Sequence, residues 1–207
     1  MSYAPRPPST MRRINAGACP VVVNLVADWP LSFLSFYGIS HEKGKPMSDN
    51  LIARLIPHQG CVITRRDDAI EISGSAMNWV MSAAVAPLVC RAPFAFRVVG
   101  KTDSTNLRMH WHRGELIFNW ECSVRELRVH DPVTAEQHSL KDKGFLTTAD
   151  WHDIVWEIGL DRMRVIVDGE VRFDGAGDYS GIESAPSVGP CFGSTISVRE
   201  FRITPLA

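Results

Sequence analysis

Residues 106–121 contain a dense row of polar side chains of types that bind polar ligands. The row consists of Asn106, Arg108, His110, His112, Glu115, Asn119 and Glu121. Guanidinium, imidazole, amide and carboxylate groups hold their hydrogen bonds in fixed directions, which suits sugar hydroxyls or a ligand carboxylate. The row contains no lysine, which is common on a solvated surface. These residue types favour a ligand-binding face, with an ordinary solvated sheet face as the alternative.

The polar residues alternate with apolar ones, which predicts two β-strands. The strands cover Asn106–His112 and Glu115–Cys122, and Arg113-Gly114 is a two-residue connection with the glycine that a tight hairpin turn favours. Alternate residues of a strand point to opposite faces of a sheet. The face predicted to enter the core comprises Leu107, Met109, Trp111, Leu116, Phe118 and Trp120.

The position of the turn predicts which polar residues are neighbours across the hairpin. The expected pairs are His112 with Glu115, His110 with Ile117, Arg108 with Asn119, and Asn106 with Glu121. Arg108 and Asn119 would then form a paired set of donors. Glu121 would accept hydrogen bonds from ligand hydroxyls, and His110 would make binding depend on pH.

Short alternating segments separated by turn residues recur along the chain, which is typical of a β-sandwich. They are residues 61–65 and 69–73 around the turn Arg66-Asp67-Asp68, then 79–85, 94–100, 151–158, 163–167, 171–173 and 193–203. Residues 49–56 fit either a short helix or a strand. Helical periodicity is scarce. The sequence therefore predicts an all-β fold, an antiparallel sandwich of two sheets.

Two features predict the register near the C-terminus. Asp168-Gly169 between alternating apolar residues is a strong hairpin signal. A three-residue loop with a glycine bulge would place five apolar residues on one face, namely Met163, Val165, Val167, Val171 and Phe173. In the last strand, the residues predicted to point inward are Ile196, Val198, Phe201 and Ile203.

The composition excludes several classes of protein. Of the 207 residues, 45% are hydrophobic and 22% are charged, and the formal net charge is −1. These values argue against a disordered chain and against a membrane protein. Because there is no excess of basic residues, nucleic acid is not an expected partner either.

The first 46 residues differ from the rest, since a Pro- and Arg-rich leader and Gly44-Lys45-Pro46 precede the regular pattern. We expect residues 1–46 to be an extension outside the native fold, with Met47 as the natural start, and residues 47–207 to form one domain. The apolar run in this extension is interrupted by Pro20, Asn24, Asp28 and Pro30, which argues against a signal peptide or a membrane span.

The five cysteines are widely and irregularly spaced, at Cys19, Cys61, Cys90, Cys122 and Cys191. None of them belongs to a zinc motif. We expect reduced thiols, with Cys122 packed as a small apolar residue. Reduced thiols and the lack of a clear signal peptide predict a cytoplasmic protein.

Three segments of the C-terminal half form a pattern: Trp151-His152-Asp153-Ile154-Val155-Trp156-Glu157, the run 163–170 with its Val-Asp-Gly turn, and the closing run 197–203. Together they resemble concanavalin A-like lectin/glucanase domains, a superfamily of laminin-G-like jelly rolls. The resemblance covers roughly Pro93 to Leu206. It implies two stacked sheets, one of them curved, with ligands on the concave face. The class includes lectins, carbohydrate-binding modules, glycoside hydrolases and polysaccharide lyases, so the resemblance does not decide between binding and catalysis.

Glycoside hydrolysis is one alternative on the polar face. It needs two carboxyl groups, about 5.5 Å apart for retention and up to about 9.5 Å for inversion. On one straight strand, Glu115 and Glu121 would lie roughly 20 Å apart, and Asp153 and Glu157 roughly 13 Å apart. Both separations are too long, so a carboxylate from another strand, such as Asp103 or Asp178, would have to approach Glu121.

A polysaccharide lyase is a second catalytic alternative. It would use Arg108 or Asn119 to neutralise a uronate, His110 as the base and Tyr179 as the acid. The candidate catalytic residues are therefore Glu121 and His110. Sugar-stacking platforms are expected among Trp79, Trp151 and Trp156, each with core packing as the alternative.

No metal site is predicted from the spacing of the residues. Asp174-Gly175-Ala176-Gly177-Asp178 has the residue types of a calcium site, but turns need the same residues. His110 and His112 would need a third ligand such as Glu121. The segment 130–134 is predicted to be a turn. We therefore expect no cofactor, with calcium as the alternative.

Together these observations predict a single jelly-roll domain over residues 47–207 that binds carbohydrate, or a similarly hydroxyl-rich ligand, on a polar concave face. The ligand-binding residues would be Arg108, His110, His112, Asn119, Glu121 and Asn106. The alternatives are a glycan-active enzyme on the same face and a protein-interaction module.

Overall fold

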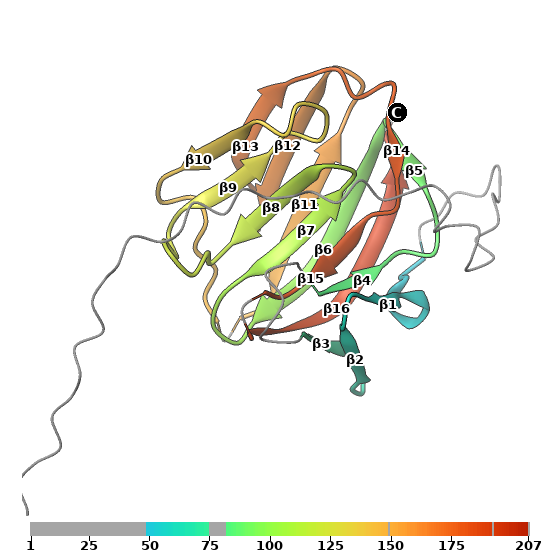
Figure 1. Ribbon diagram of the computed structural model, residues 1–207, viewed down its shortest axis with the longest axis vertical. Coiled ribbons are helices and arrows are strands. Elements are labelled where there is room, and N and C mark those ends of the chain that lie inside the picture. The colour runs from blue at the N-terminus through green and yellow to red at the C-terminus, as the bar shows by residue number, and fades with distance from the viewer. Residues whose placement is uncertain (1–48, 75–81, 149, 192, 207) are drawn as a thin grey trace, which may run out of the picture.

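The computed structural model describes residues 49–74, 82–148, 150–191 and 193–206. This part of the chain forms two seven-stranded antiparallel sheets and one two-stranded sheet. The two large sheets lie face to face as a sandwich (Figure 1). The prediction of an all-β, two-sheet fold is confirmed. Among the described residues, no helix has the length and apolar character that a membrane span requires.

Sheet A contains, in spatial order, β1 (Ile56–His58), β4 (Ala83–Val85), β15 (Ser187–Gly189), β7 (Leu107–Trp111), β8 (Gly114–Phe118), β9 (Leu127–His130) and β10 (Gln137–Leu140). Sheet B contains β13 (Glu170–Ala176), β12 (Arg162–Val167), β11 (His152–Ile158), β6 (Phe94–Thr102), β16 (Thr195–Pro205), β3 (Ile70–Ser73) and β2 (Val62–Arg65). The small sheet pairs β14 (Glu183–Ser184) with β5 (Cys90–Arg91). A short 3₁₀ helix, η1 (Ile52–Arg54), precedes β1.

Most predicted strands are present. Residues 49–56 contain both of the expected possibilities, because η1 is followed by the first residue of β1. The predicted segment 79–85 is described only from residue 82, and Trp79 lies outside the described residues. Three strands of sheet A, β9, β10 and β15, were not predicted, because each is only three or four residues long.

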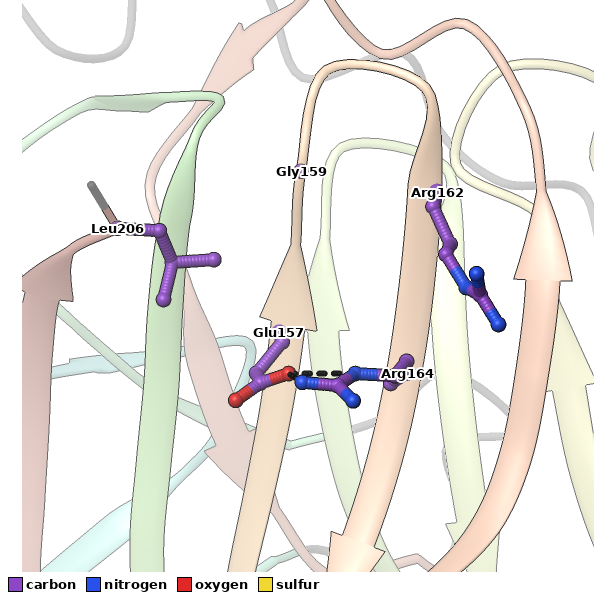
Figure 2. Close-up of a pocket in the computed structure, with 5 residues that line it drawn as sticks. All are labelled: Glu157, Gly159, Arg162, Arg164 and Leu206. Atoms are coloured by element: carbon purple, nitrogen blue, oxygen red, sulfur yellow. Dashed lines mark hydrogen bonds and ion pairs between the residues drawn. The ribbon is translucent and has the colours of Figure 1, made fainter.

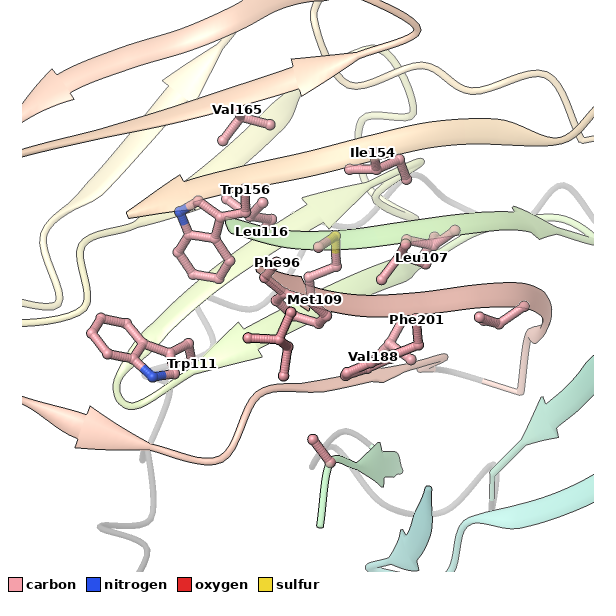
Figure 3. Close-up of a cluster of buried hydrophobic side chains, with 14 of the residues drawn as sticks. Phe96, Leu107, Met109, Trp111, Leu116, Ile154, Trp156, Val165, Val188 and Phe201 are labelled. Carbon is pink, nitrogen blue, oxygen red and sulfur yellow. The ribbon is translucent and has the colours of Figure 1, made fainter. Parts of the chain in front are cut away.

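The interior between the two sheets is filled by the apolar face of each strand. Figure 3 shows Trp111, Met109 and Leu116 of sheet A packed against Phe96, Trp156 and others of sheet B. Complete burial of each such side chain contributes about 1.5–3 kcal/mol. The indole N–H of Trp111 donates to the carbonyl oxygens of Cys90 and Ser184, at 3.3 and 3.2 Å. The predicted inward direction is confirmed for Leu107, Met109, Trp111, Leu116, Phe118, Ile196, Val198, Phe201 and Ile203.

The β7–β8 hairpin has a different turn from the predicted one. His110 pairs with Glu115 and Trp111 with Gly114, so the loop is His112-Arg113. His112 adopts a φ of 54° there. Gly114 lies in the strand, where a Cβ would come within 2.7 Å of Pro132 and 3.0 Å of the Trp156 ring. The glycine therefore serves close packing and not the turn, and the predicted cross-strand pairs were wrong by two residues.

The β12–β13 hairpin also departs from the predicted loop. Asp168 and Gly169 form a two-residue turn with φ values of 52° and 83°, and Val167 pairs with Glu170. The predicted bulge lies further along, where the register shifts between Val165 and Ile166. Phe173 consequently pairs with Val165 as expected, but Val171 is 45% exposed instead of facing the core.

The cysteines differ from the expectation at one position. Cys61, Cys90 and Cys191 are thiols, and burial raises the pKa of Cys61 to about 11. Cys122 is exposed and disulfide-bonded. The prediction that Cys122 packs as a reduced apolar residue was therefore wrong, and cytoplasmic location loses that support. Residues 1–46 lie outside the described residues, so their assignment as an extension stays a prediction.

Candidate functional site

The outer face of sheet A carries most of the polar residues that the sequence singled out. The register places Glu115 of β8 between His110 of β7 and His130 of β9. The adjacent rung carries Arg108, Ile117 and Arg128. Because the register error was an even number of residues, the predicted division into a polar and an apolar face is preserved from residue 107 to residue 118. We call this region the polar face and add His130 and Arg128 to it.

Arg108, Asn106 and Glu115 form the buried base of the polar face. Nη1 of Arg108 donates to Oε1 of Glu115 at 3.0 Å, and its Nε and Nη2 donate to Oδ1 of Asn106 at 3.1 and 2.8 Å. All three residues are no more than 6% exposed. A planar guanidinium held at several points has a fixed position, so this base is a rigid support for whatever lies above it.

Glu121 reaches the same guanidinium because the chain bends sharply after β8. Asn119 has a φ of 49°, and Trp120 forms a bridge with Ser123, which ends the strand at Phe118. Oε2 of Glu121 lies 3.8 Å from Nη2 of Arg108. Glu115 and Glu121 therefore flank one guanidinium, and their carboxylates are no farther apart than the about 9.5 Å limit for an inverting glycosidase. The estimate of roughly 20 Å was wrong because it assumed a straight strand.

Asn119 supports this bend from inside the protein. Its side-chain amide donates to the carbonyl oxygen of Leu146 at 2.8 Å and accepts from the Leu146 N–H at 2.7 Å. Its backbone N–H donates to the carbonyl oxygen of Gly144 at 3.0 Å, and its carbonyl oxygen accepts from Asn106. Asn119 therefore pairs with Asn106 and not with Arg108. The expected Arg108–Asn119 donor set is not formed.

Among the residues that the structure describes, three buried polar atoms of the polar face have no hydrogen-bond partner. They are Nε2 of His110, Nε2 of His130 and Oε2 of Glu121. Nε2 of His110 nevertheless lies 3.0 Å from Oε1 of Glu115, within ion-pair distance. A buried polar group that lacks a partner costs about 1–3 kcal/mol. Hydroxyl groups, which both donate and accept, are suited to complete all three.

The pKa values of two residues on this face are shifted by their neighbours. Burial by itself would raise the pKa of Glu115, but the interactions with His110 and Arg108 outweigh burial and hold that pKa well below its usual range. For His130, burial lowers the pKa more than the nearby Glu115 raises it. Glu115 is thus ionised and His130 is neutral at pH 7.

Trp120 supplies an aromatic border to the polar face, contrary to its predicted place in the core. The positive φ at Asn119 breaks the alternation of the strand, so the indole turns to the side of Arg128. The Arg128 guanidinium lies 3.1 Å from the centre of the Trp120 ring, and its Nε donates to Glu126 at 3.1 Å. Trp120 is partly exposed. A cation–π contact of this kind is worth about 0.5–1 kcal/mol at exposed sites.

The other sequence candidates lie at the edge of this site or in other parts of the fold. His112 lies in the β7–β8 turn. Tyr179 is fully buried in the core, and its hydroxyl donates to Asp131 at 2.8 Å. Asp131 also accepts from the backbone N–H groups of Val133 and Thr134, which confirms the predicted turn. Trp156 is fully buried in the core, which confirms core packing, the alternative to a sugar-stacking platform.

The candidate calcium segment has its carboxylates bonded within the protein. Asp174 forms an ion pair with Arg162, and Oδ1 of Asp178 accepts from the hydroxyl and the N–H of Ser180. Within the described ranges of the chain, no group of three or more His, Cys, Asp or Glu side chains is arranged to hold a metal ion.

A pocket of about 310 Å³ lies on the outer face of sheet B, between Leu206 and the arginines of β12 (Figure 2). Arg164 is paired with Glu157, as the dashed line in Figure 2 indicates. Asp153, the other acidic residue considered on β11, is bound by Arg97 at 2.8 Å. These carboxylates serve ion pairs on the sheet surface, and the polar face is the site that better fits a hydroxyl-rich ligand.

A second cluster of polar residues joins the loop after β10 to the β12–β13 turn. Nδ1 of His152 is 2.7 Å from Oδ2 of Asp168, and Nε2 is 3.0 Å from the hydroxyl of Thr147. Oδ1 of Asp168 accepts from the N–H of Asp153 at 2.9 Å. Burial would raise the pKa of Asp168, but the bonds from His152 and Asp153 outweigh it and hold the pKa below its ordinary value.

This cluster predicts a pH-dependent loss of stability. Because the folded pKa of Asp168 is depressed, its charge stabilises the protein above its unfolded pKa of about 3.9, and this stability is lost as the pH falls through the folded value. In Asp168→Asn, the free energy of unfolding should fall less steeply between pH 5 and pH 2 than in the wild type, as measured by urea unfolding. Asp67→Asn, in an exposed turn, controls for the lost charge. Parallel wild-type and Asp168→Asn curves would contradict the assignment.

The fold is that of concanavalin A-like β-sandwiches, as the sequence resemblance implied. It is similar in structure to the carbohydrate-binding module CBM66 from Bacillus subtilis, with a TM-score of 0.54, 6% identity, and 72% of this chain and 94% of that chain covered. It is also similar to a prokaryotic β-1,3-1,4-glucanase (lichenase) from a mouse hindgut metagenome, with a TM-score of 0.53, 10% identity, and 79% and 89% covered. No protein-family model and no curated sequence matches this chain.

Proposed function

We propose that the protein binds carbohydrate on the polar face of sheet A. The observation that carries the proposal is a set of three buried polar atoms, on His110, His130 and Glu121, that have no hydrogen-bond partner among the described residues. They lie beside a rigid base of Arg108, Asn106 and Glu115. Sugar hydroxyls can donate to the carboxylate and can donate to or accept from the imidazoles. The structural similarity to a carbohydrate-binding module and to a glucanase supports this ligand class.

The residues divide into two roles in this proposal. Asn106, Arg108 and Asn119 are buried and bonded to the protein, so they position the site. His110 and Glu121 are 23% and 26% exposed in their side chains, and they would contact the sugar. His112, in the turn, would lie at the edge of the site.

Replacing Glu121 with glutamine should weaken glycan binding by about tenfold or more, because a hydrogen bond to a charged group contributes about 1.5–3 kcal/mol. A glycan array would identify the oligosaccharide, and titration calorimetry would measure its affinity. Glu157→Gln on sheet B is the matched control and should leave binding within twofold. A confirmed ligand that binds Glu121→Gln as tightly as the wild type would exclude the polar face.

Glycoside hydrolysis is a second candidate, favoured by the approach of Glu115 and Glu121 to the one guanidinium of Arg108. The depressed pKa of Glu115 suits an ionised base, and Glu121 would have to supply the acid. Release of reducing ends, abolished in both Glu121→Gln and Glu115→Gln, would support an enzyme.

The lyase alternative lacks the acid proposed for it, because Tyr179 is buried and its hydroxyl is bonded to Asp131. A partner protein that co-purifies without any glycan response would favour an interaction module.

A further inference from the structure

The outer face of sheet B carries arginines that are almost all matched with carboxylates. Arg97 pairs with Asp153 and with Glu200, both at 2.8 Å. Arg202 also pairs with Glu200. The two arginines of β12 are matched in the same way, Arg162 by Asp174 and Arg164 by Glu157. The cations of this surface are therefore largely neutralised by neighbours on adjacent strands.

Lys101 and Arg199 are exceptions on this surface. Each lies beside Trp151: Nζ of Lys101 is 4.9 Å from the centre of the indole ring, and Cζ of Arg199 is also 4.9 Å from it. Within residues 49–74, 82–148, 150–191 and 193–206, neither cation has a carboxylate within 4 Å. Asp103, an acid on the loop that follows Lys101, instead accepts from the N–H of Thr195.

β16 contains a backbone irregularity at Arg199, one of these two cations. Lys101 pairs with Ser197, and the register then shifts between Val198 and Glu200, which leaves Arg199 as the extra residue of a β-bulge. Bulges redirect a side chain relative to the regular alternation of a strand and often occur next to functional sites. Arg199, the bulged residue, is exposed, and its guanidinium lies beside the ring of Trp151, the residue that precedes β11.

We propose that Trp151, Lys101 and Arg199 form a second binding site, for a sugar that carries an oxyanion, either a carboxylate or a sulfate. Two cations without carboxylate partners supply charge-assisted hydrogen bonds to one such group. The partly exposed indole beside them offers apolar surface to a sugar ring. With only two cations in the cluster and a net charge of −1 for the chain, a single acidic group fits better than a nucleic acid or an anionic membrane. The site is separate from the polar face, which lies on the other sheet.

Titration calorimetry with tetragalacturonate tests the carboxylate form, and a sulfated galactose disaccharide tests the sulfate form. The methyl ester and the desulfated sugar are the neutral counterparts. At least one acidic sugar should bind the wild type and its neutral counterpart should not. Binding should weaken severalfold between 50 and 300 mM NaCl, because the site is exposed to salt.

The variant Lys101→Gln/Arg199→Gln should weaken binding of the acidic sugar by about tenfold or more. The matched control is Arg162→Gln/Arg164→Gln, which removes two positive charges from the same surface and should keep the affinity within twofold. Both pairs are on the surface, and thermal unfolding would verify the fold of each variant. A second measurement uses the wild-type protein and so does not depend on the folding of a variant. The indole N–H signal of Trp151 in its NMR spectrum should shift when the acidic sugar is added. Comparison with the spectrum of Trp151→Phe would assign that signal.

The outcomes separate this site from the polar face. Loss of acidic-sugar binding in Glu121→Gln, with binding retained in Lys101→Gln/Arg199→Gln, would overturn the second site and support the polar face instead. Absence of binding by both acidic sugars, equal binding of a neutral counterpart, or equal weakening in the two double variants would each overturn the proposal.

Discussion

Replacing Arg108 with methionine is expected to lower the free energy of unfolding by about 3–5 kcal/mol at pH 7, because it removes the guanidinium from a buried ion pair and leaves the carboxylate of Glu115 buried. The side chains of Arg108 and Glu115 are 7% and 6% exposed, so water cannot take the place of the guanidinium. The substitution also removes the donor to Asn106 and the cation beside Glu121. Urea unfolding at several protein concentrations would measure the change.

The matched control for this substitution is Arg164→Met. Arg164 pairs with Glu157 on the surface of sheet B, where the side chains are 44% and 22% exposed. A surface ion pair contributes about 0–1 kcal/mol, so the loss should be several times smaller. The double substitution Arg108→Met/Glu115→Leu should recover part of the loss, because no unpaired charge then remains buried. Equal losses in Arg108→Met and Arg164→Met would show that the Arg108 pair is not a buried one.

The loss in Arg108→Met should also depend on pH, in a direction that the Glu115 pKa determines. In the wild type, that pKa is depressed, so the Glu115 charge stabilises the protein above the ordinary value of about 4.3. Without Arg108, one of the interactions that oppose the effect of burial is lost and the pKa of Glu115 rises, so protonation relieves the buried charge as the pH falls. The difference between wild type and variant should therefore be largest at pH 7 and smaller at pH 4. A difference that grows on acidification would contradict this account.

The alternation of residues along 106–118 was enough to divide the hairpin into its two faces. Leu107, Met109, Trp111 and Phe118 are fully buried, as predicted. The error in the turn shifted the pairing by two residues, which changes the cross-strand neighbours but leaves each side chain on its face. The face of a residue depends only on whether its position in the strand is odd or even, whereas the register depends on the position of the turn. The turn was placed at Gly114 because glycine is common in turns, and that placement was wrong.

What the sequence could not predict depends on contacts between distant segments. The position of Gly114 is determined by Pro132 and Trp156, which close over it. The bend at Asn119 is determined by the backbone of Leu146, 27 residues away. That bend brings Glu121 to Arg108 and turns Trp120 out of the core. His130 and Arg128 could have been found, because 127–130 alternates Leu, Arg, Val, His, but four residues are a weak signal.

Replacing Gly144 with alanine is expected to destabilise the protein by about 3 kcal/mol and to disturb the polar face at the same time. A Cβ at this position would lie 2.1 Å from the carbonyl oxygen of Glu126 and 2.4 Å from the backbone nitrogen of Leu127. Both contacts are with backbone atoms, so no side chain can rotate to relieve them.

Neither of the two crowded segments can move without losing hydrogen bonds. The N–H of Gly144 donates to the carbonyl oxygen of Arg125 at 2.9 Å, and its carbonyl oxygen accepts from Asn119 at 3.0 Å. Moving the 144 loop outward would therefore release Asn119, straighten the chain after β8 and carry Glu121 away from Arg108. The loss of stability and the loss of glycan binding should occur together in this variant.

The control for this prediction is Gly181→Ala, where a Cβ would meet no atom within 4 Å. It should change the free energy of unfolding by less than about 1 kcal/mol and leave binding unaffected. If Gly144→Ala unfolds with the same midpoint as the wild type, the close packing of the 144 loop on the 125–127 segment is wrong. If it is destabilised but binds glycan normally, the bend at Asn119 does not position Glu121, and the carboxylate must be held by Arg108 alone.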